Sequence, residues 1–199
     1  MKRWSADVSR ETRQSLEQLA DLLVKWNQTV NLISRGDEKL LWERHILDSL
    51  QLATQMNPRP SRGIDFGSGA GFPGLVLALA TGVPFELIEA DHRKAAFLRE
   101  ATRITGAPAR VHAVRIEAAR LAPAPLITAR GVADLPRLLD LAEPLLSPGG
   151  MCLFLKGANA CPELTAAASR WHMRVQQIPS RTHRDASILR ISELARAGG

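Results

Sequence analysis

Apolar residues recur at three- and four-residue steps near the start of the chain, which predicts a helix from about residue 9 to residue 27. Ser9 is a favoured N-cap residue for it. Asp37 is expected to cap a second helix that runs to about residue 55. In that helix the one-turn spacing suggests side-chain pairs between Arg44 and Asp48 and between His45 and Ser49. The apolar positions that define the first helix are Leu16, Leu19, Leu22, Leu23 and Trp26.

From residue 62 onward, short apolar runs alternate with helical patterns. The runs predict strands that end near residue 66 and cover residues 85–89, 110–114, 126–130, 151–156, 172–178 and 187–191. The helical patterns cover residues 73–81, 91–105, 134–146 and 162–170, with a brief helix opened by Glu117. Residues 147–150 are predicted to form a turn before the fifth strand.

This alternation is typical of right-handed βαβ units and of an α/β fold with a mostly parallel sheet. The last two strands have no helix between them, so they predict an antiparallel hairpin. The turn-rich residues 57–61 separate a helical segment, residues 1–60, from a main domain, residues 61–199.

A glycine-rich stretch follows the first predicted strand of the main domain. Gly69, Gly71 and Gly74 satisfy the spacing G-x-G-x-x-G, which on its own is a weak indication. Twenty-two residues after Gly67, the second strand ends in Glu89, whose carboxylate is suited to the hydroxyls of a ribose. The pair of features indicates a nucleoside ligand. It does not distinguish NAD from S-adenosylmethionine, and a turn that binds nothing is the simpler alternative.

The carboxyl ends of parallel strands lie at one rim of the sheet, where α/β proteins bind ligands. Phe72, Arg130 and Lys156 are expected there and could contact a ligand, although Phe72 could equally belong to the core. No nucleophile–base–orienter triad and no metal-ligand cluster is apparent. Methyl transfer from a sulfonium to an unprotonated nitrogen needs neither, because it depends on proximity and alignment.

The charge of the chain favours an anionic partner. Its 199 residues carry a formal net charge of +6 with a pI of about 10.1, and nucleic acid is the first candidate. Two cysteines at irregular spacing, no membrane-length apolar run and no apolar N-terminal segment predict a cytoplasmic protein without membrane attachment. Plain solubility charge is the alternative explanation of the basic balance.

Several motifs, in order along the chain, resemble the bacterial small-subunit (16S) ribosomal RNA guanine-N7 methyltransferase family, RsmG, also called GidB. The block around His45 is specific to that family rather than to methyltransferases in general. The motifs are Trp26-Asn27, Asn31-Leu32, Arg44-His45-Ile46-Leu47-Asp48-Ser49-Leu50, Asp65-Phe66-Gly67-Ser68-Gly69-Ala70-Gly71-Phe72-Pro73-Gly74, Ala129-Arg130-Gly131-Val132 and Leu155-Lys156-Gly157.

The resemblance implies a class I, Rossmann-like methyltransferase fold with a seven-stranded sheet, S-adenosylmethionine as methyl donor and a guanine of small-subunit rRNA as acceptor. By matching position it implies two groups of residues. The cofactor would be held by the glycine turn (Gly67, Ser68, Gly69, Gly71), Phe72, Glu89, Ile116, Glu117 and Arg130. The methyl group or the target base would lie near Arg44, His45, Asp48 and Lys156.

Phosphate contacts are expected from the arginines Arg59, Arg62, Arg181 and Arg184. The protein is expected to act as a monomer on small-subunit rRNA or on the assembling small subunit. Two other functions stay open: a nicotinamide-dependent oxidoreductase with the same glycine pattern, and a non-catalytic RNA-binding factor that keeps the fold.

Overall fold

The structure, a computed structural model, describes residues 8–198. The prediction that the N-terminus lacks an apolar segment concerns residues that lie outside this range. The α-helices are α1 (Arg10–Asn27), α2 (Asp48–Leu50), α3 (Gly74–Thr81), α4 (His92–Thr105), α5 (Leu135–Ala142) and α6 (Ala160–Ala168). The strands are β1 (Gly63–Phe66), β2 (Phe85–Ile88), β3 (Ala109–His112), β4 (Ala124–Arg130), β5 (Leu146–Lys156), β6 (Trp171–Pro179) and β7 (Ser187–Arg196).

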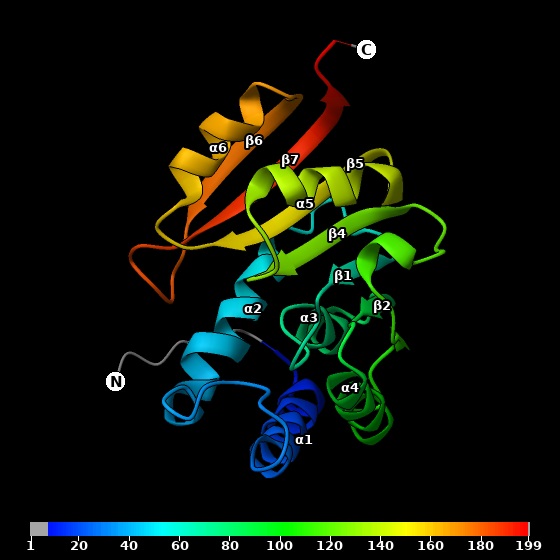
Figure 1. Ribbon diagram of the computed structural model, residues 1–199. Helices are drawn as coiled ribbons and strands as arrows, with labels where there is room; N and C mark the ends of the chain where they lie inside the picture. The colour runs from blue at the N-terminus through cyan, green and yellow to red at the C-terminus, as the bar shows by residue number, and fades with distance from the viewer. Residues whose placement is uncertain (1–7, 199) are drawn as a thin grey trace.

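Within the described residues, seven strands form one sheet in the order β3-β2-β1-β4-β5-β7-β6 (Figure 1). The first five run parallel to one another, and β7 lies antiparallel between β5 and β6. The predicted parallel sheet with an antiparallel C-terminal hairpin is confirmed. The strand order reverses between β1 and β4, and open α/β sheets bind ligands outside the carboxyl ends of the strands at such a point.

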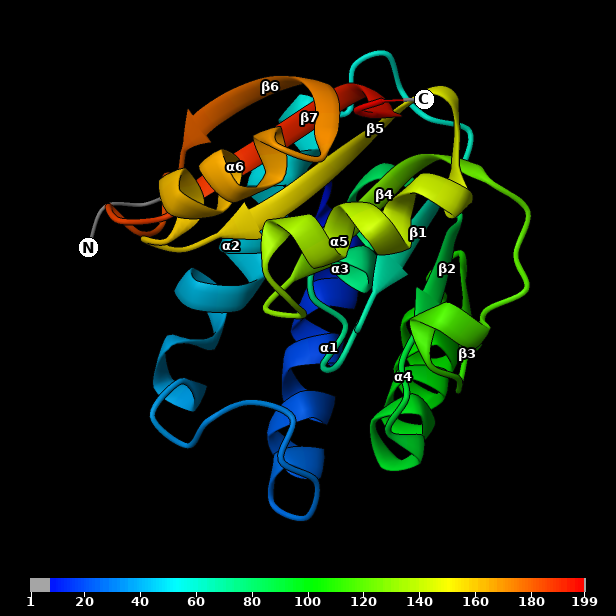
Figure 2. The same cartoon turned by 45° about the horizontal axis from the view of Figure 1, so that its top comes forward.

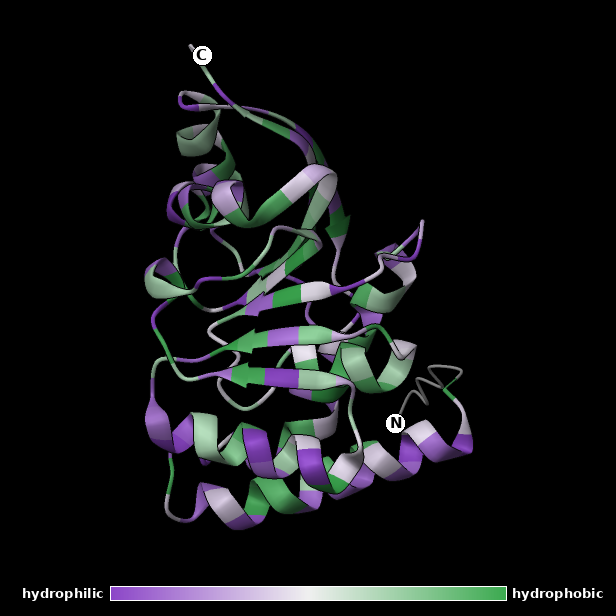
Figure 3. Cartoon of the chain, turned by 90° about the vertical axis from the view of Figure 1, so that its right-hand side faces the viewer, coloured by the Kyte–Doolittle hydropathy of each residue, from purple (hydrophilic) through white to green (hydrophobic). Residues whose placement is uncertain are grey.

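Helices cover both faces of the sheet (Figures 1 and 2). α1, α3 and α4 share one buried apolar cluster on one face, and α5 and α6 share a second cluster on the other. In Figure 3 the helices along the lower edge alternate between hydrophobic and hydrophilic segments. This is the pattern of helices that bury one face and expose the other.

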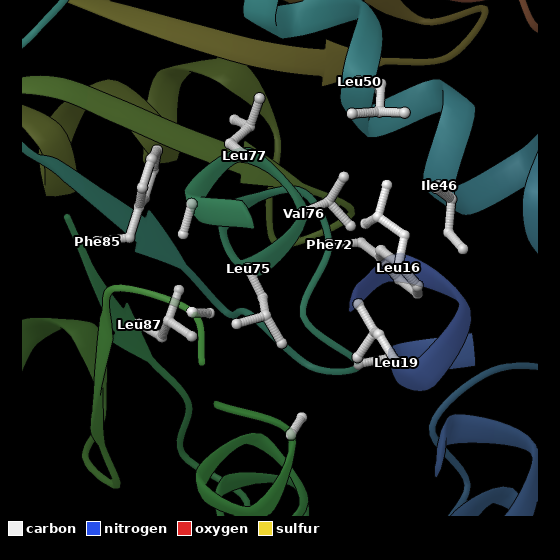
Figure 4. Packing of buried hydrophobic residues seen from close by; sticks show 14 of the residues in the cluster. Leu16, Leu19, Ile46, Leu50, Phe72, Leu75, Val76, Leu77, Phe85 and Leu87 are labelled. Carbon is white, nitrogen blue, oxygen red and sulfur yellow. The ribbon is translucent and has the colours of Figure 1, made fainter. Parts of the chain in front are cut away.

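The N-terminal segment packs on the main domain through a shared core. Leu16 and Leu19 of α1 belong to the same apolar cluster as Ile46, Leu50 and Phe72 (Figure 4). Burying side chains of this size stabilises the contact by about 1.5–3 kcal/mol each. The domain boundary near residue 60 stays a prediction.

The first predicted helix is confirmed, and the second is wrong as a regular α-helix. Ser9 Oγ accepts a hydrogen bond from Thr12 N at 3.2 Å and caps α1. Residues 38–55 instead form successive short turns: a 3₁₀ turn, a π-helical stretch from Trp42 to Leu47, α2, and a second 3₁₀ turn. Asp37 makes no capping hydrogen bond there, because its carboxylate accepts from Ser34 and Arg44 instead.

The predicted turn at residues 147–150 lies inside β5. Leu146 already pairs with Ala124, and the next pair joins Met151 to Leu126. Four residues of β5 therefore stand opposite the single Pro125, as a bulge in which Gly149 has a φ of 71°. The predicted turn therefore coincides with an irregularity in the structure. It lies inside β5 rather than before it, because β5 pairs with β4 on both sides of residues 147–150.

Candidate active site

The glycine turn after β1 requires glycine at three positions. Gly67, Gly69 and Gly71 have φ values of 57°, 52° and 91°, a region that other residues rarely adopt. Ser68 is buried, and its hydroxyl donates to Asp65 O at 3.2 Å. Its backbone is engaged as well, since Ser68 N donates to Ile88 O at 3.0 Å and Ser68 O accepts from Gly71 N at 2.6 Å, so Ser68 shapes the turn from within and its predicted contact with the cofactor stays a prediction.

Asp65 lies beneath the turn as a fully buried acid. Its Oδ1 accepts a hydrogen bond from Thr128 Oγ1 at 2.6 Å, whereas Oδ2 has no partner among the described residues at hydrogen-bond geometry. Burial raises the pKa of Asp65 to about 6. A Cβ on Gly74 would lie only 2.4 Å from Asp65 Cβ, so the first turn of α3 approaches the acid closely.

The acid predicted at the end of the second strand converges on the glycine turn. Glu89 Oε2 accepts from Gly69 N at 2.8 Å, and Glu89 Oε1 accepts from Asp91 N at 2.8 Å. The chain thus places a carboxylate beside a tight turn of backbone amides, 20 residues apart in sequence. A carboxylate at this place is the acceptor that the ribose hydroxyls of a nucleoside require.

Ile116 and Glu117 follow β3 in a short 3₁₀ turn. Glu117 is exposed and forms an ion pair with Arg137 of α5. Both residues line a separate hollow against α5. Their predicted contact with the cofactor stays a prediction.

A pocket of about 400 Å³ opens at the carboxyl rim of the sheet and gathers the four residues predicted near the base. Arg44, His45 and Asp48 come from the irregular helical segment, and Lys156 comes from the end of β5. The pocket is lined by Asp37, Arg44, His45, Asp48, Arg130, Gly131, Leu155, Lys156, Gly157, Thr182, His183 and Ala186.

His45 and Arg130 are in direct contact in this pocket. Arg130 Nη2 lies 2.8 Å from His45 Nδ1. A guanidinium carries only donors, so His45 Nδ1 supplies the lone pair and the ring proton is on Nε2. Burial, followed by the charge of Arg130, lowers the pKa of His45 to about 4. The imidazole is therefore neutral at pH 7.

Phe72 links the glycine turn to this pocket. Its ring is buried and stacks on His45, with centroids 5.1 Å apart and an interplanar angle of 14°. The Arg130 guanidinium carbon lies 5.1 Å from the centre of the same ring, within the range of a cation–π contact. Both interpretations of Phe72 thus have support: it is part of the core and also borders the site.

Asp48 pairs with Arg130 at 3.5 Å, and Arg44 pairs with Asp37. The one-turn pair predicted between Arg44 and Asp48 is therefore wrong. So is the pair between the His45 and Ser49 side chains, because the Ser49 hydroxyl donates to His45 O at 2.7 Å. The π-helical widening and the approach of β4 give these side chains other partners.

Lys156 is held in the wall of the pocket. Its Nζ lies 2.6 Å from Glu163 Oε2 and donates to Ala133 O at 2.9 Å. The side chain is only 10% exposed. Its ammonium is thus already paired, and its predicted place near the methyl group stays a prediction.

Comparison with known proteins assigns the family. A family profile described as rRNA small subunit methyltransferase G matches residues 12–189. The ribosomal RNA small subunit methyltransferase G of Granulibacter bethesdensis is 57% identical over 189 residues, which cover 95% of this chain and 89% of that protein. The protein of the same name from Gluconobacter oxydans is 55% identical and covers 95% of this chain and 97% of its own length. This chain belongs to the rRNA small subunit methyltransferase G family.

Solved structures of other methyltransferases have the same fold as this chain. The O-methyltransferase of Bacillus cereus, solved in complex with SAH, has a TM-score of 0.60 at 14% identity and covers 90% of this chain and 91% of its own. The SAM-dependent O-methyltransferase of Thermotoga maritima has a TM-score of 0.59 at 16% identity, covering 76% of this chain and 66% of its own. The predicted class I methyltransferase fold is confirmed.

The protein is an S-adenosylmethionine-dependent methyltransferase, as the motifs indicated. The family assignment favours this function over the nicotinamide-dependent oxidoreductase and the non-catalytic RNA-binding factor. Among residues 8–198 no helix is both long enough and apolar enough to span a bilayer.

The four arginines predicted to bind RNA lie at two different edges of the methyltransferase. Arg181 and Arg184 lie in the β6–β7 loop, next to the pocket-lining residue Thr182. Arg62 directly precedes β1 and donates to Pro123 O at 2.7 Å, before the start of β4. Arg59 is three residues further upstream. The second pair therefore lies at the amino ends of the strands, away from the pocket.

Three residues of the pocket region escaped prediction from the sequence. Glu163 pairs with Lys156, Thr182 donates to Asp48 Oδ1 at 2.5 Å, and Gln51 donates to the same oxygen at 2.7 Å. The spacing of Gln51 from Asp48 places both on one helical face, which is the one available indication. Nothing in the local sequence of Glu163 or Thr182 indicates their partners.

Proposed function

We propose that this enzyme transfers the methyl group of S-adenosylmethionine to N7 of a specific guanine in small-subunit (16S) ribosomal RNA. The observation that carries the proposal is the pocket in which His45, Arg130 and Asp48 meet, one aromatic ring away from the glycine turn. Family membership supports small-subunit rRNA as the substrate.

The cofactor would be held by the backbone of Gly67, Gly69 and Gly71 and by the Glu89 carboxylate. The contact between Glu89 and Gly69 supports this fit, because it brings an acceptor for ribose hydroxyls to the turn. When bound, S-adenosylmethionine supplies an electrophilic methyl group whose leaving group is a neutral thioether. Phe72, Ile116, Glu117 and Arg130 are further contacts that the proposal takes from the motif match.

The acceptor side of the proposal needs no general base. N7 of guanine presents a lone pair without a proton, so no proton has to be removed before the transfer. This agrees with His45, a neutral imidazole whose Nδ1 lone pair is engaged by Arg130. We assign His45 to positioning and shaping of the site, which is how a reaction governed by proximity gains its rate.

The pocket also suits the polar edge of the base. Guanine O6 is an acceptor next to the reacting N7, and Arg44 and Arg130 supply donors on the lining that would hold O6 while the lone pair of N7 stays free for the methyl group. Arg44 is half exposed, so it is available to a ligand in spite of its pair with Asp37. Lys156 would hold the wall of the pocket together with Glu163.

The RNA backbone would be bound by arginines around the pocket, with Arg181 and Arg184 the nearest of the four predicted. We further propose that the enzyme acts as a monomer in the cytoplasm. Light scattering behind a sizing column tests the first point, and fractionation of cells expressing the tagged chain tests the second.

The test of the function is transfer of labelled methyl to small-subunit rRNA that lacks the modification. Naked RNA and small ribosomal particles serve as parallel substrates. Mass spectrometry of nuclease digests is expected to find one 7-methylguanosine in at least one of the two. Label on another atom or on another RNA, or its absence from both substrates although calorimetry shows donor binding, contradicts the proposal.

A further inference from the structure

Gln51 is an almost fully buried polar residue that none of the roles above uses. It is 3% exposed and follows Asp48 by three residues, so both side chains leave the same side of the irregular helical segment. A buried amide is costly unless its donors and acceptor are paired. Its partners therefore indicate what it does.

The Gln51 amide bridges two parts of the chain that are far apart in sequence. Nε2 donates to Asp48 Oδ1 at 2.7 Å and to Ser180 Oγ at 3.1 Å. Oε1 accepts from Arg181 N at 3.0 Å. The orientation of the amide is determined, because a backbone N–H needs an acceptor and a carboxylate needs a donor.

The partners of Gln51 also organise the β6–β7 loop, residues 180–186. Ser180 Oγ accepts from Thr182 N at 3.2 Å and from His183 N at 3.3 Å, and so holds the loop in a turn. Thr182 Oγ1 donates at 2.5 Å to the same Asp48 oxygen that Gln51 contacts. The β6–β7 loop is thus attached to the irregular helical segment through the Gln51 amide and the Asp48 carboxylate.

This attachment is directed toward the acceptor side of the site. The loop carries Arg181, His183 and Arg184, and Thr182 and His183 line the pocket. Gln51 touches neither the glycine turn nor Glu89, since its partners are Asp48 and the loop. A change at Gln51 should therefore act on RNA and leave the methyl donor unaffected.

We propose that Gln51 is a positioning residue that fixes the basic β6–β7 loop against the acceptor pocket, so that the loop meets the RNA in one orientation. The inference rests on the proposed function, because it takes RNA to be the acceptor. Its structural half, the anchoring of the loop, is tested without RNA.

The first experiment compares Gln51→Leu with Gln55→Leu. Gln55 lies one turn further on, and within residues 8–198 the one hydrogen bond of its amide goes to the Thr54 hydroxyl next to it. Gln51→Leu is expected to raise KM for the rRNA substrate about tenfold, to change kcat less, and to leave the dissociation constant of S-adenosylmethionine within twofold. Gln55→Leu should leave all three constants unchanged.

The second experiment is limited trypsin digestion of the full chain in the absence of RNA. Cleavage after Arg181 and Arg184 is expected to be at least fivefold faster in Gln51→Leu than in the wild type and in Gln55→Leu. Should Gln51→Leu fail to fold, Ser180→Ala removes the same anchor from the loop side and is expected to give the same two results, with a smaller effect.

The outcomes separate the two proposals. If trypsin cleaves Gln51→Leu faster but the wild type transfers no methyl group to the RNA, the proposed function is contradicted and the anchoring of the loop by Gln51 stands. Unchanged cleavage, an unchanged KM for RNA, or a parallel loss of donor affinity in a folded variant would overturn the role of Gln51.

Discussion

Arg130 Nη2 lies 2.8 Å from His45 Nδ1, although the two residues are 85 positions apart in the chain. The contact joins the end of β4 to the N-terminal helical segment. It also determines the state of the imidazole, because the arginine can only donate and its charge disfavours protonation. Phe72 packs against both side chains and connects them to the glycine turn.

Replacing Arg130 by Gln should raise the pKa of His45 above its present value of about 4, because the charge of Arg130 is the second cause of the lowering. Burial, the first cause, remains, so the pKa should stay below 6.5. Methyl transfer should fall at least tenfold, since Asp48 and His45 lose their shared partner. Titration of the His45 ring proton shifts by NMR in the variant and the wild type measures the pKa. A downward shift would contradict the contact.

Asp65 should make the protein less stable as pH rises from about 4 to about 6. Its pKa is raised in the folded state by burial, from 3.8 to about 6. The folded state then holds a proton that the unfolded state has released, and the stabilising contribution of the neutral acid is lost through this window. The effect is roughly 3 kcal/mol in free energy of unfolding.

The measurement is the difference in unfolding free energy between Asp65→Asn and the wild type at several pH values. The unfolding free energy of Asp65→Asn relative to that of the wild type should increase as pH rises and become constant above about 6. His45 titrates with the opposite sign, since its lowered pKa withdraws stability as pH falls from 6.5 to about 4. Taking the difference between two proteins that both contain His45 removes that contribution. A flat difference would contradict the raised pKa of Asp65.

Gly74→Ala should destabilise the enzyme by about 1–3 kcal/mol, the usual cost of overpacking. Its new Cβ would lie 2.4 Å from Asp65 Cβ, where the buried side chain has no room to move. Gly157→Ala is the control, because a Cβ there has nothing within 4 Å and the backbone is not left-handed. Denaturant midpoints report both changes. Equal loss in the two variants would argue against the close contact.

Glu89→Gln should weaken S-adenosylmethionine binding at least tenfold. The carboxylate accepts from Gly69 and Asp91, and an amide of the same shape has only one acceptor. Glu86→Gln is a matched control three residues upstream in β2, since Glu86 pairs with His112 away from the turn. Isothermal calorimetry with the donor gives both constants. Equal affinity in the two variants would remove Glu89 from the site.

Charge reversal should distinguish the two pairs of arginines. Arg181→Glu with Arg184→Glu should reduce RNA affinity at least tenfold at moderate salt, because these residues flank the pocket and phosphate contacts dominate affinity. Arg59→Glu with Arg62→Glu should have a smaller effect, since that pair lies at the other edge of the sheet. Filter binding over a salt series measures both. Donor affinity should stay unchanged in each double variant.

Much of the fold was accessible from sequence because its determinants are local. The glycine turn, the acid at the end of the second strand, and the Ser9 cap each depend on residues within one turn or one loop. The alternation of strands and helices then restricts the topology to a parallel sheet with few connections. The irregular segment at residues 38–55 was missed because its π-helical turn depends on tertiary packing against other helices and leaves no periodic pattern.

The contacts between side chains in the pocket could not be predicted from local sequence patterns. Sequence periodicity brought Arg44, His45 and Asp48 to one helix, but it paired Arg44 with Asp48 and His45 with Ser49. Of their actual partners, Asp37 lies seven residues before Arg44, whereas Arg130 and the β6–β7 loop are brought to the rim by the pairing of β4 with β5 and of β5 with β7. That pairing arises from folding of the whole core, so side chains 82, 85 and 134 residues apart meet only once the chain has folded.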